Sequence, residues 1–331
     1  MRGSSFVCAK LVETHKIFLR KIENFAISSL NKNSGGTISY ERYKDDNQLG
    51  VIIINNPTKR GAISAEMMLQ FANVIDELEG EMNPPMGLVF ASSGQYFSAG
   101  LDLNLAKNCI NTNEIGAAMQ LYMSDATNRL RALPCISVTV IDGPALGGGM
   151  ELITSTDYRI MRNPRPIENI EANNNTSPNT SSTNTNPFIQ SVHAMIGATP
   201  GFGGAARLVS IVGRRHALRI LGSSTRIQPW DAMTMGLVDT LYHRDINYNG
   251  SSGGETTVVS DIDAGYKFLK PFLEQPFSSG VHAMKNIVHA ADADNSEISE
   301  SKESLGMKKE REVFTSRWFG EDNRKALGLE K

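Results

Sequence analysis

The stretch GPALGGGMEL, residues 143–152, decides how this chain folds. It follows an apolar, β-branched run from Ile136 to Ile141, which predicts a buried strand, and it leads into a predicted helix over residues 147–156. Small residues at the exit of a strand let the backbone approach a ligand closely, and the first N–H groups of a helix have no partners within the helix. The stretch therefore predicts a ligand site at a strand–helix junction. It lacks the GK[ST] ending of a phosphate-binding loop.

Strands and helices alternate on both sides of this stretch. Further apolar runs at residues 51–54, 86–90 and 158–161 predict strands. Apolar residues at helical spacing predict helices over residues 64–79, with Ser64 as the capping residue, and over residues 114–132. This alternation is typical of an α/β architecture.

Three more segments belong to the same pattern. The first, FSAGLDL at residues 97–103, is a second glycine-containing turn that follows a predicted strand. If N–H groups from this turn and from the 143–152 turn point at one atom, they form an oxyanion hole, in which each donor contributes roughly 3–4 kcal/mol. The other two are TPGFGG at residues 199–204, before a helix predicted to start at Ala205, and PWDAMTMGLVD at residues 229–239.

Composition limits the class of protein. The 331 residues are enough for one large domain or two small ones, and 40% are hydrophobic. The net charge of −2 argues against binding nucleic acid through bulk charge, and no apolar run reaches the ~18 residues of a membrane helix. Cys8, Cys109 and Cys135 share no CxxC spacing, which disfavours a disulfide framework or a zinc site. We expect reduced, packed thiols.

The ends and one internal segment differ from the rest. Residues 1–36 are basic, and Leu11, Phe18, Ile22 and Phe25 would form one stripe on a helix, as in a mitochondrial presequence or a helix docked on the domain. Nineteen of the 25 residues at 163–187 are Asn, Ser, Thr or Pro, which predicts a disordered surface insertion. Other segments are read as a loop over 245–257, helices over 261–275 and 277–292, and a charged stretch from 297 to 319 that docks on its own core or a neighbouring subunit.

The four motif segments, in this order, resemble the enoyl-CoA hydratase/isomerase (crotonase) superfamily. The resemblance runs over about residues 37–331 and is interrupted by the insertion. It implies an α/β fold of the ClpP/crotonase type, a ββα spiral with a C-terminal helical region that trimerises. The spiral core would span residues 37–260 and the helical region residues 261–331.

Within the superfamily, stretches such as GGTISYERY, GGGMEL and Val192-His193 are similar to a decarboxylating branch. The resemblance implies that the N–H groups of Ala99 and Gly148 form the oxyanion hole. It places Glu151 at one of the two acid/base glutamates of family hydratases. His193 stands where those hydratases have the second glutamate. Because hydration uses two carboxylates, a histidine there disfavours a hydratase.

The implied reaction is loss of CO2 from a 2-carboxyacyl-CoA such as ethylmalonyl-CoA, or methylmalonyl-CoA, through a thioester enolate. Either His193 or Glu151 then delivers a proton to the α-carbon. Because the thioester accepts the electrons, we expect no metal and no organic cofactor. Lys59, Arg60 and Arg207 are candidates for the CoA phosphates, although solvated surface charge is the simpler reading of each. The residues expected to contact substrate are Lys59, Gly61, Ala62, Ser98, Leu101, Gly147 and Pro200.

Two alternatives remain. The first is an enoyl-CoA hydratase or isomerase that uses Glu151 alone. The second is a non-catalytic relative that binds CoA or RNA, against which the presence of both glycine turns and Glu151 argues. The expected partners are the acyl-CoA substrate and further copies of the chain in a homotrimer or hexamer, without nucleic acid or membrane. The resemblance favours the cytosol, and the basic N-terminus favours the mitochondrion.

Overall fold

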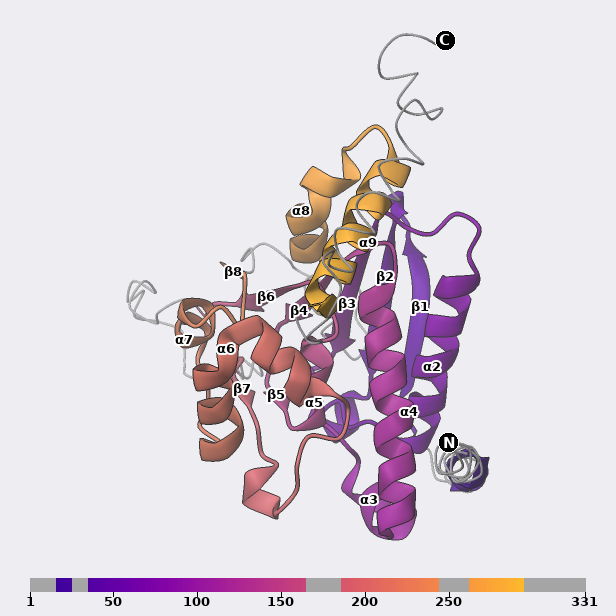
Figure 1. Ribbon diagram of the computed structural model, residues 1–331, viewed down its shortest axis with the longest axis vertical. Helices are drawn as coiled ribbons and strands as arrows, with labels where there is room; N and C mark the ends of the chain where they lie inside the picture. Colours follow the sequence, from indigo (N-terminus) through magenta and orange to yellow (C-terminus); the bar gives the residue numbers. More distant parts are fainter. Residues whose placement is uncertain (1–15, 26–34, 165–185, 244–261, 295–331) are drawn as a thin grey trace, which may run out of the picture.

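In the computed structural model, which describes residues 16–25, 35–164, 186–243 and 262–294, the centre of the molecule is a six-stranded sheet (Figure 1). Only the first pair of strands is antiparallel; every other neighbouring pair is parallel. The strands lie in the spatial order β1 (Thr37–Tyr43), β2 (Asp46–Asn55), β3 (Gly87–Ser93), β4 (Ile136–Ile141), β6 (Tyr158–Arg162) and β8 (Thr240–Tyr242).

Helices connect most of the successive strands along the chain. They are η1 (Pro57–Lys59), α2 (Ala65–Gly80), α3 (Leu103–Asn108), α4 (Asn113–Ala132), α5 (Gly148–Ile153), η3 (Ala194–Ile196), α6 (Gly204–Ser223), α7 (Pro229–Thr234), α8 (Ile262–Leu273) and α9 (Ser278–Asp294). The α/β class and every strand and helix expected between residues 51 and 161 are confirmed, with α5 shorter than its predicted range. The helix expected from Ala205 and those over 261–275 and 277–292 are confirmed as α6, α8 and α9.

The sheet is buried on both faces, which explains why its strands are continuously apolar rather than alternating. On one face, side chains such as Ile52 and Phe90 join the larger core cluster together with α2 and α4. On the other, Val89 and Val140 join a second cluster under α8. Gly265 of α8 has no room for a side chain, because a Cβ there would lie 2.8 Å from Val89 Cγ2.

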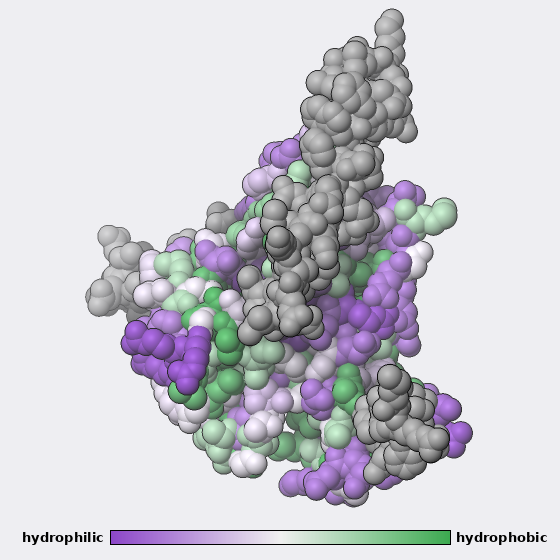
Figure 2. Space-filling model, in the orientation of Figure 1, coloured by the Kyte–Doolittle hydropathy of each residue, from purple (hydrophilic) through white to green (hydrophobic). Residues whose placement is uncertain are grey.

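Helix α2 begins where the sequence predicts. The Ser64 hydroxyl accepts a hydrogen bond from the Met67 N–H at 3.2 Å, which satisfies one of the free donors of the first turn. The apolar residues Met67, Phe71 and Ile75 then recur on one face and are fully buried. Figure 2 shows mainly hydrophilic residues over α2, on the right of the view.

A short second ladder brings two distant segments together. β5 (Ala145–Leu146) pairs in parallel with β7 (Ile189–Gln190). The Ala145 N–H donates to the Phe188 carbonyl, and the Gly147 N–H donates to the Gln190 carbonyl. The chain that follows β7, including His193, is thereby fixed beside the glycine turn after β4.

Residues 16–25 form a helix that is docked on the domain. Phe18 and Ile22 belong to the larger core cluster of the domain. This agrees with the expectation of a docked N-terminal helix. Cys109 and Cys135 are buried free thiols, as expected. Cys8, Leu11, the greater part of the 163–187 insertion, the 245–257 loop and the 297–319 stretch lie outside the described residues.

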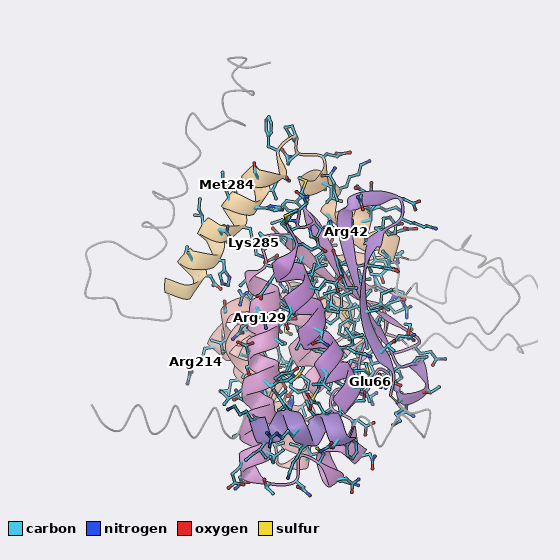
Figure 3. All side chains as sticks on the ribbon, turned by 90° about the vertical axis from the view of Figure 1, so that its right-hand side faces the viewer. Arg42, Glu66, Arg129, Arg214, Met284 and Lys285 are labelled. Carbon is cyan, nitrogen blue, oxygen red and sulfur yellow. The ribbon has the colours of Figure 1, made fainter. Side chains whose placement is uncertain are left out.

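Helix α9 is anchored by one buried cation. Lys285 forms an ion pair with Asp157, and its Nζ also donates to the Cys135 carbonyl at 3.3 Å. The neighbouring Met284 is 65% exposed, so α9 presents apolar surface on the opposite side (Figure 3). Whether α8 and α9 serve trimerisation stays a prediction. None of the helices within the described ranges has the length and apolar character of a membrane-spanning segment.

Candidate active site

The two predicted glycine turns are in direct contact. The Leu146 N–H donates to the Ser98 carbonyl at 2.9 Å, and Ser98 and Ala145 form a β-bridge. Gly100 adopts φ +85°, and a Cβ on it would lie 2.7 Å from the Gly148 nitrogen. Only glycine fits there, because a side chain would meet both the backbone strain and the neighbouring turn.

The N–H group of Ala99 is not available to a substrate, which corrects its expected role. It donates to the Arg60 carbonyl at 2.9 Å. The next N–H, of Gly100, donates to Ser98 Oγ at 3.1 Å. Among the described residues no acceptor takes the N–H of Leu101 or that of Gly148. Leu101 and Gly148 therefore offer one free N–H group from each of the two turns.

The turn contact gives a direct test. Gly100→Ala should lower kcat about tenfold to a hundredfold, because the new methyl displaces Gly148 from its place beside the Leu101 turn. Steady-state kinetics measures the change, and the unfolding midpoint separates it from loss of fold. Gly116→Ala in α4 is the matched control, since no atom lies within 4 Å of its added Cβ. A folded Gly100→Ala enzyme with full kcat would show that the two turns do not act together.

Glu151 is held by the third motif segment. Its side chain is 1% exposed and accepts three backbone hydrogen bonds: Gly201 N–H to Oε1 at 3.0 Å, and Phe202 and Gly204 N–H to Oε2 at 2.7 and 2.9 Å. The last of these donors lies at the start of α6, where the helix dipole also favours a negative charge. Gly204 must be glycine, because a Cβ there would lie 2.5 Å from Glu151 Cγ.

His193 meets Glu151 as the motif order predicts. Its Nε2 lies 3.2 Å from Glu151 Oε1, and its Nδ1 lies 3.1 Å from Ser191 Oγ. Because the carboxylate only accepts, Nε2 carries the proton of this pair; in the neutral ring Nδ1 then accepts from the Ser191 hydroxyl. The side chain is 11% exposed, and a Cβ on Gly147 would lie 3.9 Å from Nε2. Ser191 was missed, although its position two residues before His193 is a usable signal.

Arg207 does not face a CoA phosphate, which excludes that candidate role. Its guanidinium is buried and donates to the carbonyls of Glu151 and Phe202. It also donates to the hydroxyls of Thr127 and Thr154. Burial lowers the pKa of Arg207 to about 10, partly offset by the Glu151 charge, so the side chain stays cationic at neutral pH. Arg207 ties α4, α5 and the Glu151 turn together.

Lys59 lies beside the same turns but has a partner. Its Nζ is 3.0 Å from Asp102 Oδ2, and Asp102 caps α3. Burial raises the pKa of Asp102, but hydrogen bonds from Lys59 and from the first turn of α3 outweigh it and lower the pKa overall. A contact between Lys59 and substrate stays a prediction.

The remaining predicted substrate contacts cluster around these turns. Ser98 Oγ donates to the Gly61 carbonyl at 2.7 Å, and Asn56 Nδ2 donates to the Ala62 carbonyl at 2.7 Å. The predicted site residues thus lie in several segments joined by hydrogen bonds: the 97–103 turn contacts residues 60–61 and 145–146, and Glu151 contacts His193 and the 201–204 turn. Gly147 precedes the free N–H of Gly148, and Pro200 precedes the turn that holds Glu151.

The chain is similar to several known proteins. The family model described as enoyl-CoA hydratase/isomerase matches residues 44–315. Similar curated proteins include ethylmalonyl-CoA decarboxylase of Xenopus laevis, with 33% identity over 89% of this chain and 83% of that protein. The Homo sapiens protein of the same name is 29% identical over 90% of this chain and 83% of its own length.

Solved structures show the same fold. Enoyl-CoA hydratase from Thermoplasma volcanium GSS1 has a TM-score of 0.66 and 21% identity, over 89% of this chain and 97% of that one. Pseudomonas aeruginosa DspI has a TM-score of 0.66 and 20% identity, over 88% and 92%. At this level of identity the likeness bears on the fold alone.

Proposed function

This chain belongs to the enoyl-CoA hydratase/isomerase family and has the crotonase fold, and from that premise we propose that it decarboxylates a 2-carboxyacyl-CoA such as ethylmalonyl-CoA. The observation that carries the proposal is the partner of Glu151. A hydratase of this family needs a second carboxylate to position water, and this chain offers the imidazole of His193 at 3.2 Å. The likeness to proteins named ethylmalonyl-CoA decarboxylase supports the same reaction.

The thioester oxygen would bind between the N–H groups of Leu101 and Gly148. As the C–CO2 bond breaks, its electron pair moves into the thioester and negative charge grows on that oxygen. Two fixed donors stabilise the charge without reorganising, which lowers the barrier more than it strengthens substrate binding. The contact between Gly100 and the Gly148 nitrogen supports this placement, because it holds the two donors in neighbouring turns.

His193 is the proton donor in this proposal. Glu151 already accepts three N–H groups of the 201–204 turn, so a proton on its carboxyl would leave one of those donors facing a hydroxyl. The imidazole, in contrast, carries its proton on Nε2, the atom that faces both Glu151 and Gly147. Glu151 would then orient the ring of His193.

The reaction balances without a cofactor. The substrate loses CO2 and becomes an enolate; the enolate takes one proton at the α-carbon from Nε2 of the imidazolium form of His193, which leaves a neutral ring with its proton on Nδ1, and solvent then restores the lost proton. The product is the acyl-CoA shortened by one carboxyl group. A substrate longer or shorter by one methylene would differ by only about 1–3 kcal/mol of binding, so we expect ethylmalonyl-CoA and methylmalonyl-CoA both to react.

The purified protein should release CO2 from ethylmalonyl-CoA and leave crotonyl-CoA nearly unchanged. Both assays use the same preparation: mass spectrometry follows loss of the carboxyl group, and enoyl absorbance follows hydration. Brisk hydration without decarboxylation would instead establish the hydratase alternative. Binding of CoA without either turnover would establish a non-catalytic relative.

Assembly and location remain proposals of the same kind. We expect a homotrimer or hexamer, and acyl-CoA rather than nucleic acid or membrane as the partner. A cytosolic location is proposed over a mitochondrial one, because Phe18 and Ile22 are part of the folded core, which does not suit a segment that is cleaved off.

A further inference from the structure

Phe202 connects the two halves of the site. Its ring packs on Gly148, since a Cβ on that glycine would lie 2.6 Å from Cε2 of Phe202. Its backbone N–H donates to Glu151 Oε2 at 2.7 Å. One residue therefore contacts both the proposed oxyanion donor and the buried carboxylate, and its side chain is only 1% exposed.

The backbone of Phe202 is held from the opposite side. Its carbonyl accepts from Arg207 at 2.7 Å and from Thr127 Oγ1 at 2.9 Å. With both backbone groups bonded, the ring has little freedom to leave Gly148. These hydrogen bonds hold the backbone of Phe202 independently of the ring. Replacing the ring should therefore leave the backbone of residue 202 in place.

We infer that the ring of Phe202 keeps water out of the space at Gly148, next to Glu151, and that this exclusion adds to the effect of His193 in suppressing hydration relative to decarboxylation. The inference rests on the proposed function. A carboxylate that accepts backbone N–H groups would also bind water if space were open beside it, and water next to an acyl-CoA bound at Gly148 is the reactant of a hydratase. The ring fills the space beside Gly148, and the backbone N–H of the same residue bonds Glu151 Oε2. A dry site also favours loss of a charged carboxylate as neutral CO2.

Removing the ring would create a wet cavity, not an empty one. Engineered cavities lined only by apolar atoms stay dry, but water enters where polar partners are available. Here the lining would include the backbone at Gly148, and the Glu151 carboxylate is hydrogen-bonded to the backbone N–H of residue 202 itself. On a 2-enoyl-CoA, water held there would add its oxygen to the β-carbon and give one proton to the Glu151–His193 pair; the electron pair of the C=C bond would enter the thioester, and the α-carbon would then take a proton from the same pair.

The test compares Phe202→Ala, Phe202→Leu and the wild type, with Phe71→Ala as the matched control. Phe71 is equally buried, in α2, where its ring stacks on Phe90. Each preparation is assayed for decarboxylation of ethylmalonyl-CoA and for hydration of crotonyl-CoA, after its folded fraction has been measured by thermal unfolding.

In Phe202→Ala we expect the rate of decarboxylation to fall about tenfold. The rate of hydration should rise at least about tenfold above that of the wild type, which is at the low end of the effect of one positioned catalytic group. Phe202→Leu keeps the space apolar and should leave both rates within about threefold. Phe71→Ala should leave the ratio of the two rates unchanged. The inference is overturned if folded Phe202→Ala gains no hydration, whether or not decarboxylation falls. If the wild type does not decarboxylate, the proposed function fails, and the gain of hydration alone then decides the role of Phe202.

Discussion

His193→Gln should lower kcat for decarboxylation by about a hundredfold to ten-thousandfold, the range for losing a general acid, while KM changes little. The glutamine amide can still donate to Glu151 Oε1, which removes the titratable proton without leaving that oxygen unpaired. The measurement is steady-state kinetics on ethylmalonyl-CoA, with the folded fraction of each preparation checked by thermal unfolding.

Two comparisons make this prediction specific. His216→Gln replaces an exposed histidine of α6 and should leave kcat unchanged. Ser191→Ala, which removes the hydroxyl 3.1 Å from Nδ1, should lower kcat much less than loss of the ring. If His193→Gln retained wild-type kcat, Glu151 or water would have to be the proton donor.

Arg207→Met should destabilise the protein by about 3–5 kcal/mol, the range for removing a buried, fully bonded charged partner. Its guanidinium donates to the carbonyls of Glu151 and Phe202 and to groups on α4 and α5. Methionine fills part of the space but donates nothing, so several buried acceptors lose their partner at once. Equilibrium unfolding in urea measures the change as a lower midpoint.

The control for Arg207 lies on the same helix. Arg214 of α6 is exposed, and Arg214→Met should change the stability by less than about 0.5 kcal/mol (Figure 3). Arg207→Lys should recover only part of the loss, because one ammonium cannot reach acceptors on α4, α5 and the 201–204 turn together. An Arg207→Met protein as stable as the wild type would mean that the network is not needed to hold Glu151.

Much of the fold could be predicted because both faces of the sheet are buried. Continuously apolar runs such as 51–54 and 136–141 mark such strands clearly, and the Ser64 cap marks the start of α2. β1 was missed because its side chains are mostly exposed or half-exposed, so it carries no apolar run. The two-residue strands β5 and β7 have no periodicity at all.

The site could be predicted down to the turns but not to single atoms. Motif order placed Glu151 and His193 together, and the structure confirms that they meet. The free N–H of the 97–103 turn is determined by the segment that packs against it. The Ala99 N–H donates to the Arg60 carbonyl, and the Asp102 N–H donates to the Ile63 carbonyl. Such pairing is a property of two loops in contact, and a single sequence pattern does not contain it.

The β5–β7 ladder has a consequence for how related proteins should be compared. It fixes residues 188–190 against residues 145–147 by hydrogen bonds, regardless of the route that the polypeptide takes between β6 and β7. Homologues can therefore gain or lose many residues there and keep the same arrangement of imidazole and carboxylate. Length variation at this point carries no information about reaction chemistry, and alignments used to assign substrates should be anchored on the two flanking strands.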